Sequence, residues 1–405
     1  MDREGGRILV LNSGSSSLKF KLFRLPGLTV SARGLVESIG GRQTRAVIQW
    51  SDGQGPKRIE LQTEARDHSQ AISVMGELFK QSGTLKGLHE LAAIGHRVVH
   101  GGERFRHPVL VDAQVLEAVR SLIPLAPLHN PANLLGIEVA MEHAPDVPQV
   151  AVFDTAFHQG LPPHAYLYAI PYQMYQERHI RRYGFHGTSH AYVSRAAAEF
   201  LGRPLKELSM ITLHLGNGAS AAAVKGGRSI DTSMGFTPLE GLIMGTRSGD
   251  LDPAVIFYLA REFGMGLQEL DEMLNKKSGL KGICGDSDMR AITRRADEGD
   301  RLARTALEMF CYRIRKYIGA YMAALEGADC LVFTGGIGEN SPVVRRMCCQ
   351  GLEPLGIELD HDRNLQTAGR AAEISLSEGR VRVLVIPTDE ELEIARQTLH
   401  AMGRA

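Results

Sequence analysis

The sequence predicts an α/β protein made of two related halves. Apolar runs of strand length recur along its 405 residues, and several of them end in turns rich in glycine, serine or asparagine. Segments of helical periodicity lie between these strands, which is the alternation typical of α/β folds. One such turn contains Gly14 and another contains Gly216, half a chain later. Similar strand–turn–strand units at this separation indicate an internal duplication.

The N-terminal segment 7–23 predicts two strands joined by a turn. Residues 8–11 are an apolar run of the buried type, whereas residues 18–22 alternate apolar side chains with lysines, as in a half-buried strand. The turn between them reads Asn-Ser-Gly-Ser-Ser-Ser, so its backbone N–H groups and hydroxyls can face an anion. Residues 210–225 repeat this arrangement with a second glycine-containing turn.

The C-terminal half predicts a further series of helices and strands. Residues 301–325 carry apolar side chains at helical spacing, which predicts a long amphipathic helix. A strand at 330–333 leads into a glycine-rich turn at 334–341, whose end, Ser341-Pro342, predicts the N-cap and first residue of a helix. The strand predicted at 381–386 precedes Thr388-Asp389-Glu390-Glu391, which resembles a capping box and predicts a last helix.

Composition excludes several classes of function. Lys and Arg number 46, as do Asp and Glu, so the zero formal net charge argues against a polybasic nucleic-acid or membrane-surface binder. The five cysteines form no C-x-x-C pair, which favours a reducing cytosol over a secreted disulfide framework. The N-terminus predicts no signal peptide, and residues 121–137, although uncharged but for one histidine, contain three prolines and predict no membrane helix.

The common sequence motifs for nucleotide and metal binding give little support for a P-loop, dinucleotide or zinc site. The P-loop pattern is absent, and the G-x-G-x-x-A pattern of Gly216, Gly218 and Ala221 continues into a hairpin-like segment rather than the helix that a dinucleotide site requires. An NAD-dependent oxidoreductase therefore stays an alternative only. The H-E-x-x-H pattern is absent as well, and no third ligand is signalled for zinc.

Several other residues, taken together, suggest a site that binds anions and a metal ion. Arg97 and Arg247 lie among glycines and small residues, which suits a guanidinium that reaches a small carboxylate or phosphoryl group, although both arginines could be structural. Asp154 follows a buried-type strand, as a ligand of a metal or its water would, or as a helix N-cap would. Glu390 could complement a helix dipole, and His186 could cap a helix. Asn12, similarly, could be a plain turn former.

Nine segments resemble those of acetate kinases, in the order of that family. They are LNSGSSSLKF, GHRVVHGG, LAPLHNPANLLGI, VFDTAFHQ, YGFHGTSH, HLGNGAS, DTSMGFTPLEGLIMGTRSGDLDP, FTGGIGENS and IPTDEELEIA. They run from residue 11 to about 395, so the resemblance covers nearly the whole chain. It implies a duplicated two-lobe, actin-like ATPase fold of the sugar-kinase type, with an interlobe cleft. The lobes expected are 1–154 joined by the C-terminal helix 389–405, and a nucleotide-binding lobe of 155–388.

The resemblance also implies roles for individual residues. Positions associated with magnesium, which manganese can replace, match Asn12 and Glu390. The acetate pocket of the family matches Arg97, Val99, Leu128, Phe185 and Pro238. Its active-site positions match His129, Asp154, His186, Asn217 and Arg247, with Arg97. Its nucleotide-binding positions match Lys19, His214, Leu215, Gly216, Asn217, Gly218, Asp288, Met289, Arg290, Gly336, Ile337, Gly338, Glu339 and Asn340. Two departures are Ser13, where some members carry Ala or Cys, and Asp389, where some carry Asn.

The implied activity is reversible, Mg-dependent transfer of a phosphoryl group from ATP to acetate, in line, by a cytoplasmic homodimer. Acetate is ionised at neutral pH, so no general base is needed, and Asp154 is interpreted as a ligand of magnesium-bound water or as an orienter of an arginine. Arg97 is expected to bind the carboxylate, and Arg247, His186 and Asn217 are expected to donate to the transferring group. A propionate kinase and a non-catalytic nucleotide-binding regulator remain as alternatives.

Overall fold

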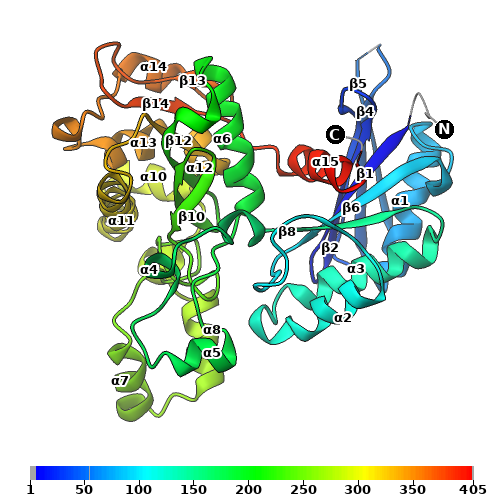
Figure 1. The fold of residues 1–405 in the computed structure, drawn as a ribbon, viewed down its shortest axis with the longest axis horizontal. Coiled ribbons are helices and arrows are strands. Elements are labelled where there is room, and N and C mark those ends of the chain that lie inside the picture. Colours follow the sequence, from blue (N-terminus) through cyan, green and yellow to red (C-terminus); the bar gives the residue numbers. More distant parts are fainter. Residues whose placement is uncertain (1–5, 54, 404–405) are drawn as a thin grey trace. The chain divides into compact units, whose positions relative to one another are not determined.

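The structure is a computed structural model that describes residues 6–53 and 55–403 (Figure 1). The chain separates into two compact units. Unit 1 comprises residues 1–156 and 389–405, and unit 2 comprises residues 157–388. The last helix, drawn in red in Figure 1, therefore belongs to the unit that contains the first strand.

Unit 1 is built on an eight-stranded sheet with the strand order β5-β4-β3-β2-β1-β6-β8-β7. The strands are β1 (Arg7–Ser13), β2 (Ser17–Arg24), β3 (Thr29–Glu37), β4 (Thr44–Ser51), β5 (Pro56–Thr63), β6 (Leu91–Val98), β7 (Val109–Leu110) and β8 (Gln149–Phe153). The helices of this unit are α1 (His68–Ser82), α2 (Ala113–Ser121), α3 (Asn130–His143) and α15 (Glu390–Ala401). Buried alternate residues of β2 confirm the half-buried strand that its lysine spacing predicts.

Unit 2 is built on a six-stranded sheet with the order β11-β10-β9-β12-β14-β13. Its strands are β9 (Ser209–Leu215), β10 (Ala219–Lys225), β11 (Arg228–Thr232), β12 (Cys330–Thr334), β13 (Ala372–Glu373) and β14 (Arg382–Val385). Its longer helices are α6 (Gly187–Leu201), α7 (Ala254–Phe263), α8 (Leu267–Lys276), α10 (Met289–Asp297), α11 (Arg301–Ala324) and α13 (Pro342–Cys349). Its shorter ones are α4 (Pro163–Tyr166), α5 (Gln173–Arg178), α9 (Gly279–Cys284), α12 (Gly335–Asn340) and α14 (His361–Gln366).

The two sheets share one topology. In unit 1, β3-β2-β1 pair antiparallel, β1-β6-β8 pair parallel, and β7 is antiparallel to β8. Unit 2 repeats this order and these strand directions: β11-β10-β9 pair antiparallel, β9-β12-β14 pair parallel, and β13 is antiparallel to β14. This match confirms the internal duplication that the turns at Gly14 and Gly216 predict, with β4 and β5 as an addition to unit 1.

The C-terminal helix packs tightly onto the sheet of unit 1. Ile394 and Ala395 of α15 are buried in a cluster with apolar residues of β1 and β8. A Cβ atom at Gly95 of β6 would lie 2.4 Å from Oγ1 of Thr398, so only glycine permits this approach of helix to strand. The close contact holds α15 against β6, and Glu390 is the first residue of this helix.

Several predicted elements of unit 2 are confirmed, and one is wrong. The long helix α11 starts after the N-cap Asp300, and Ser341 accepts a hydrogen bond from the backbone of Val344 as the N-cap of α13. Gly216 lies between β9 and β10, which form a hairpin, so the helix of a dinucleotide site is not there. Residues 335–340, predicted as a turn, form the short helix α12 instead.

In the part of the chain that is described, no helix has the length and apolar character needed to span a membrane.

Candidate active site

Arg97 and Asp154 form a close ion pair in unit 1. They stand at the carboxyl ends of the neighbouring parallel strands β6 and β8. Nε of Arg97 lies 3.0 Å from Oδ2 of Asp154 and Nη2 lies 2.7 Å from the same oxygen, while the Asp154 side chain is only 1% exposed. Glu390 at the start of α15 is farther away, with an Oε2 to Nη2 distance of 3.7 Å.

The charges around Arg97 sum to a net negative value. Burial lowers the pKa of Arg97, but Asp154 and Glu390 outweigh it and raise this pKa above its ordinary value. The arginine is thus firmly protonated, and the three side chains together carry one net negative charge. Such a cluster can bind a cation. It can also hold a substrate carboxylate, but only when a cation lies beside that carboxylate.

The chemistry of these side chains fits magnesium. Mg²⁺ prefers oxygen ligands, keeps several waters and is usually bound by one or two carboxylates together with substrate phosphates. Asp154 and Glu390 supply carboxylates of this kind, and Asn12 supplies an amide oxygen near the end of β1 in the same unit. Among the described residues no group of three or more His, Cys, Asp or Glu is placed to hold a metal ion.

The turn after Asn12 is held by its neighbours in unit 1. The side-chain amide of Asn133 donates to the carbonyl oxygen of Ser13 at 2.8 Å, and a ring nitrogen of His68 lies 2.8 Å from that of Gly14. Oγ of Ser13 is itself buried without a hydrogen-bond partner. Lys19, opposite Asn12 in the β1–β2 pair, is exposed.

The departure at Asp389 has a structural role. Its carboxylate caps α15 by accepting from the backbone N–H of Leu392 at 2.9 Å, and Nζ of Lys21 lies 2.6 Å from Oδ2. This agrees with the N-cap interpretation. The carboxylate is therefore already engaged beside the predicted metal position Glu390.

The predicted acetate-pocket residues are divided between the units. Val99 and Leu128 lie with Arg97 in unit 1, where Leu128 is 54% exposed. His129 follows at the N-cap position of α3 but makes no capping hydrogen bond with its side chain. Phe185 and Pro238 belong to unit 2.

In unit 2 the structure brings His186 and Arg247 together around Gly218. A Cβ atom at Gly218 would lie 3.4 Å from Nε2 of His186 and 3.4 Å from Nη2 of Arg247. Gly245, near Arg247, donates to the carbonyl oxygen of Asn217 at 2.9 Å. Two side-chain nitrogens, one from His186 and one from Arg247, thus face the same small space beside Gly218.

Arg247 differs from Arg97 in its partners. Its Nη1 donates to the carbonyl oxygen of Pro238 at 2.8 Å, and among the described residues no carboxylate lies within ion-pair distance of it. Burial lowers the pKa of Arg247 below its ordinary value. A buried cation without a counter-charge is suited to binding an anion.

A hydrogen-bonded chain that local sequence patterns do not reveal orients His186. The residue has a left-handed backbone and occupies the N-cap position of α6, without the capping hydrogen bond that its place suggests. Its Nδ1 lies 2.8 Å from Oγ of Ser220, which lies 2.8 Å from Nε2 of His190. Nδ1 of His190 lies 2.7 Å from Oγ1 of Thr212. Since Nδ1 is occupied, Nε2 of His186 is the nitrogen that faces Gly218.

A cavity of about 760 Å³ in unit 2 gathers most of the predicted nucleotide-binding residues. Its lining includes Gly216, Asn217, Asp288, Met289, Arg290, Gly336, Ile337 and Asn340. Arg290 is exposed and pairs with Asp288 at 2.7 Å, so it can move without breaking the core. The volume suits a ligand of nucleotide size.

The other predicted nucleotide residues lie outside this lining. Leu215 is fully buried, Gly338 packs against Phe333, and His214 stacks on His186 with ring centroids 4.4 Å apart. Glu339 accepts hydrogen bonds from the backbone N–H groups of Gly335 and Thr388, so its carboxylate supports α12 from within.

Arg345 is a buried residue that the sequence patterns did not single out. Its guanidinium donates to the carbonyl oxygens of Gly338 and Glu339, both at 2.9 Å, and to the side chain of Asn364 at 2.8 Å. Burial lowers its pKa to about 10. Arg345 therefore holds the C-terminal part of α12, the helix whose residues Gly336, Ile337 and Asn340 line the cavity.

Comparisons with known proteins show the family of the chain. The model of the acetokinase family matches residues 7–396. The acetate kinase of Syntrophobacter fumaroxidans is 55% identical over 401 residues, 98% of each chain, and that of Thermotoga maritima is 54% identical over 97% of this chain and 98% of its own.

Solved structures give the same result. The acetate kinase of Porphyromonas gingivalis is similar with a TM-score of 0.92 and 44% identity, over 98% of this chain and 100% of that one. A propionate kinase from Francisella tularensis follows with a TM-score of 0.90 and 42% identity, over 98% and 99%. The duplicated α/β architecture and the full-length match lead to one conclusion: the chain belongs to the acetokinase family.

Proposed function

We propose that this chain is an acetate kinase, which transfers the γ-phosphoryl group of ATP to acetate and gives acetyl phosphate and ADP, reversibly. The observation that carries the proposal is the space around Gly218, where Arg247 and His186 converge without a carboxylate. It adjoins Gly216 and Asn217, which line the large cavity of unit 2. A cationic space next to a cavity of nucleotide size is what a transferring phosphoryl group requires.

The reaction needs positioning and charge neutralisation more than proton transfer. Acetate is ionised at neutral pH, so its oxygen can attack the γ-phosphorus without a general base. The difficulty is that an anion must approach a polyanion, and donors aimed at the transferring group lower this barrier. Arg247, Nε2 of His186 and the amide of Asn217 are the donors proposed here, with direct in-line transfer and no phosphorylated enzyme.

In unit 1, Arg97 is proposed to bind the acetate carboxylate and Asp154 to orient Arg97. The bidentate contact of Asp154 with Nε and Nη2 leaves Nη1 of Arg97 for the substrate. Val99, Leu128, Phe185 and Pro238 are proposed as further acetate-binding residues, and His129 as a further active-site residue. Asn12 and Glu390, with Asp154, are proposed to hold Mg²⁺ or Mn²⁺ through its waters; when bound, the ion neutralises charge on the phosphates.

The nucleotide is proposed to occupy the cavity of unit 2. Gly216, Asn217, Asp288–Arg290 and the cavity-lining residues of α12 would contact ATP or ADP directly. His214, Leu215, Gly218, Gly338 and Glu339 would shape the site from behind or beside it. Lys19, exposed on unit 1, is proposed as a further contact of the nucleotide.

A propionate kinase is the second candidate within the same chemistry. The relevant observation is the solved propionate kinase that is 42% identical to this chain. One methylene group changes binding in an apolar pocket by only about 1–3 kcal/mol, so discrimination between acetate and propionate need not be strong.

We further propose a cytoplasmic homodimer. All five cysteines are free and buried, as is usual in a reducing compartment. Helix α7 exposes Phe257 and Tyr258, and Phe263 at its end is 68% exposed. Such an apolar face suits a second copy of the chain. Sedimentation of the wild type and of Phe257→Asp tests this, because the dimer predicts a shift to monomer in the variant and a monomeric wild type would exclude it.

The activity is tested by mixing the protein with MgATP and hydroxylamine and measuring hydroxamate formed from acetate, propionate and butyrate. The proposal predicts the highest kcat/KM with acetate. A higher value with propionate would keep the mechanism and favour the second candidate. No hydroxamate from any acid, with folded protein and Mg²⁺ present, would overturn the enzyme assignment and favour a nucleotide-binding regulator.

A further inference from the structure

Residues 233–250 of unit 2 form a long loop that carries both Pro238 and Arg247. The loop leaves the sheet at the end of β11 and contains no helix or strand of its own. Loops of this length need internal support if they are to hold a side chain accurately. Arg247 depends on the loop twice, through its own backbone and through the carbonyl oxygen of Pro238 that it contacts.

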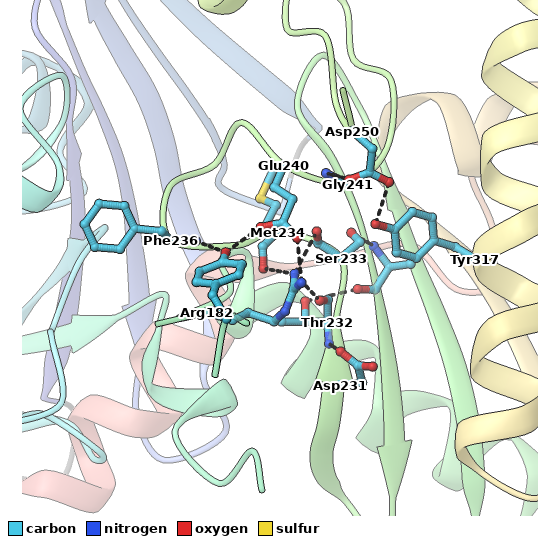
Figure 2. Close-up of polar contacts among 12 residues, drawn as sticks. Arg182, Asp231, Thr232, Ser233, Met234, Phe236, Glu240, Gly241, Asp250 and Tyr317 are labelled. Carbon is cyan, nitrogen blue, oxygen red and sulfur yellow. Dashed lines mark hydrogen bonds and ion pairs between the residues drawn. The ribbon is translucent and has the colours of Figure 1, made fainter. Parts of the chain in front are cut away.

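The start of the loop is held by Arg182, as Figure 2 shows. Nη1 of this arginine donates to three successive carbonyl oxygens, those of Thr232, Ser233 and Met234, at 3.1–3.2 Å. Its Nη2 lies 2.5 Å from Oε1 of Glu240, a residue farther along the same loop. One guanidinium thus ties the start of the loop to its middle.

Tyr168 and Gly235 complete this contact. The hydroxyl of Tyr168 donates to Oε2 of Glu240 at 2.5 Å and accepts from the backbone N–H of Phe236 at 2.8 Å. A Cβ atom at Gly235 would lie 1.8 Å from Oε2 of Glu240 and 2.2 Å from the Tyr168 hydroxyl, so a larger residue there would displace this contact. Both carboxylate oxygens of Glu240 are therefore engaged, one by Arg182 and one by Tyr168.

The far end of the loop is closed separately. Oδ1 of Asp250 accepts from the backbone N–H of Gly241 at 2.8 Å, and Oδ2 accepts from the hydroxyl of Tyr317 at 2.9 Å (Figure 2). Arg313 donates to the carbonyl oxygens of Gly241 and Asp250. Pro238 lies within the first of these supports, two residues after Phe236 and two residues before Glu240.

We propose that Arg182, Glu240 and Tyr168 are positioning residues that place the Pro238 carbonyl and, through it, the guanidinium of Arg247. Because Arg247 has no carboxylate to orient it, this support replaces the role that Asp154 has for Arg97. The inference rests on the proposed phosphoryl transfer. The supporting side chains touch no substrate themselves, so their effect on rate passes through Arg247.

The test is a kinetic double-mutant cycle. Glu240→Gln and Tyr168→Phe keep the shape of the side chains but weaken the contacts, and each is measured alone and in an Arg247→Ala background. A small displacement of a reacting group costs about 10–100-fold in rate, so we expect a loss of that order in kcat with little change in the KM for ATP. In the Arg247→Ala background the same substitutions should have almost no further effect.

Two further variants complete the design. Arg182→Lys keeps the charge and loses the fork of donors, so it should resemble Glu240→Gln rather than the wild type. Arg203→Lys is the matched control, since Arg203 pairs with Asp329 at 2.7 Å elsewhere in unit 2 and should leave kcat unchanged. Equal losses in the wild-type and Arg247→Ala backgrounds, or no loss of kcat in Glu240→Gln and Tyr168→Phe, would overturn the inference.

Hydrogen exchange separates this inference from the proposed function. In Glu240→Gln, amides of the 233–250 loop should exchange faster while those of β9 and β12 keep their rates. An inactive wild type with this local effect would overturn the proposed function and leave the support of the loop intact. Unchanged exchange across the loop would contradict the support itself, whatever the activity.

Discussion

Arg97 in unit 1 contacts Asp154 through Nε and Nη2, whereas Arg247 in unit 2 contacts the carbonyl oxygen of Pro238. The first arginine is held by charge, in a cluster whose sum is negative. The second is held by a loop and keeps its positive charge uncompensated by any described carboxylate. The difference indicates two tasks: unit 1 suits a cation and the carboxylate substrate beside it, and unit 2 suits the phosphoryl group.

The largest effect expected is that of Arg247→Ala. Loss of a donor to the transition state lowers kcat by about 10²–10³-fold, and the KM values should change much less. Arg97→Ala should instead raise the KM for acetate, because its proposed task is to bind the substrate carboxylate. Initial rates of hydroxamate formation at varied acetate and ATP decide this, and a pure KM effect in Arg247→Ala would contradict the division of tasks.

Asp154→Asn tests the charge that holds Arg97. Removing one partner of a buried ion pair costs about 3 kcal/mol, so we expect a lower free energy of unfolding in urea. The variant should also need more Mg²⁺ for half-maximal rate, with the pH profile of kcat unchanged. Unaltered Mg²⁺ dependence together with a pH-dependent loss in the chemical step would instead identify Asp154 as a base.

Low pH should destabilise both units through their buried histidines. Burial lowers the pKa of His96 in unit 1 and of His158 in unit 2 to about 4. In the unfolded chain these histidines bind protons near pH 6.5, whereas in the folded chain they do so only near pH 4. The free energy of unfolding is therefore highest above pH 6.5 and falls as the pH drops toward 4. Urea unfolding at pH 7.5, 6 and 5 should show this decline, and His96→Gln should reduce its slope. A slope unchanged by that substitution would mean that His96 does not contribute.

Some of this organisation could be predicted from local sequence, and some could not. The turns at Gly14 and Gly216 and the helix α11 follow from spacing within a few residues. The support of Arg247 does not, because Arg182 and Glu240 are 58 positions apart and neither belongs to a periodic pattern. The three glycines of α12 predict a turn. The segment is helical because the Glu339 side chain contacts Gly335 and the distant Thr388.

Asp389→Ala should have a smaller effect, confined to stability. It removes the cap of α15 and the pair with Lys21, and loss of such a cap costs about 1 kcal/mol. Asp389→Asn can still cap the helix and should lose less. Both variants should keep the Mg²⁺ dependence of the wild type, whereas a changed dependence would assign Asp389 to the metal site.

Ser13→Ala should have the smallest effect and the opposite sign. Its hydroxyl is buried without a hydrogen-bond partner, so its removal should raise the free energy of unfolding by up to about 1 kcal/mol. Chemical denaturation measures the change. A loss of stability would show that the hydroxyl has a partner after all.

The central claim is that acetate attacks ATP directly, with both arginines acting by position and charge. The most direct test uses ATP made chiral at the γ-phosphorus with oxygen isotopes and sulfur, and determines the configuration of the acetyl thiophosphate formed. Inversion is the result that a single in-line transfer predicts. Retention would require two successive transfers through a phosphorylated residue and would contradict the account.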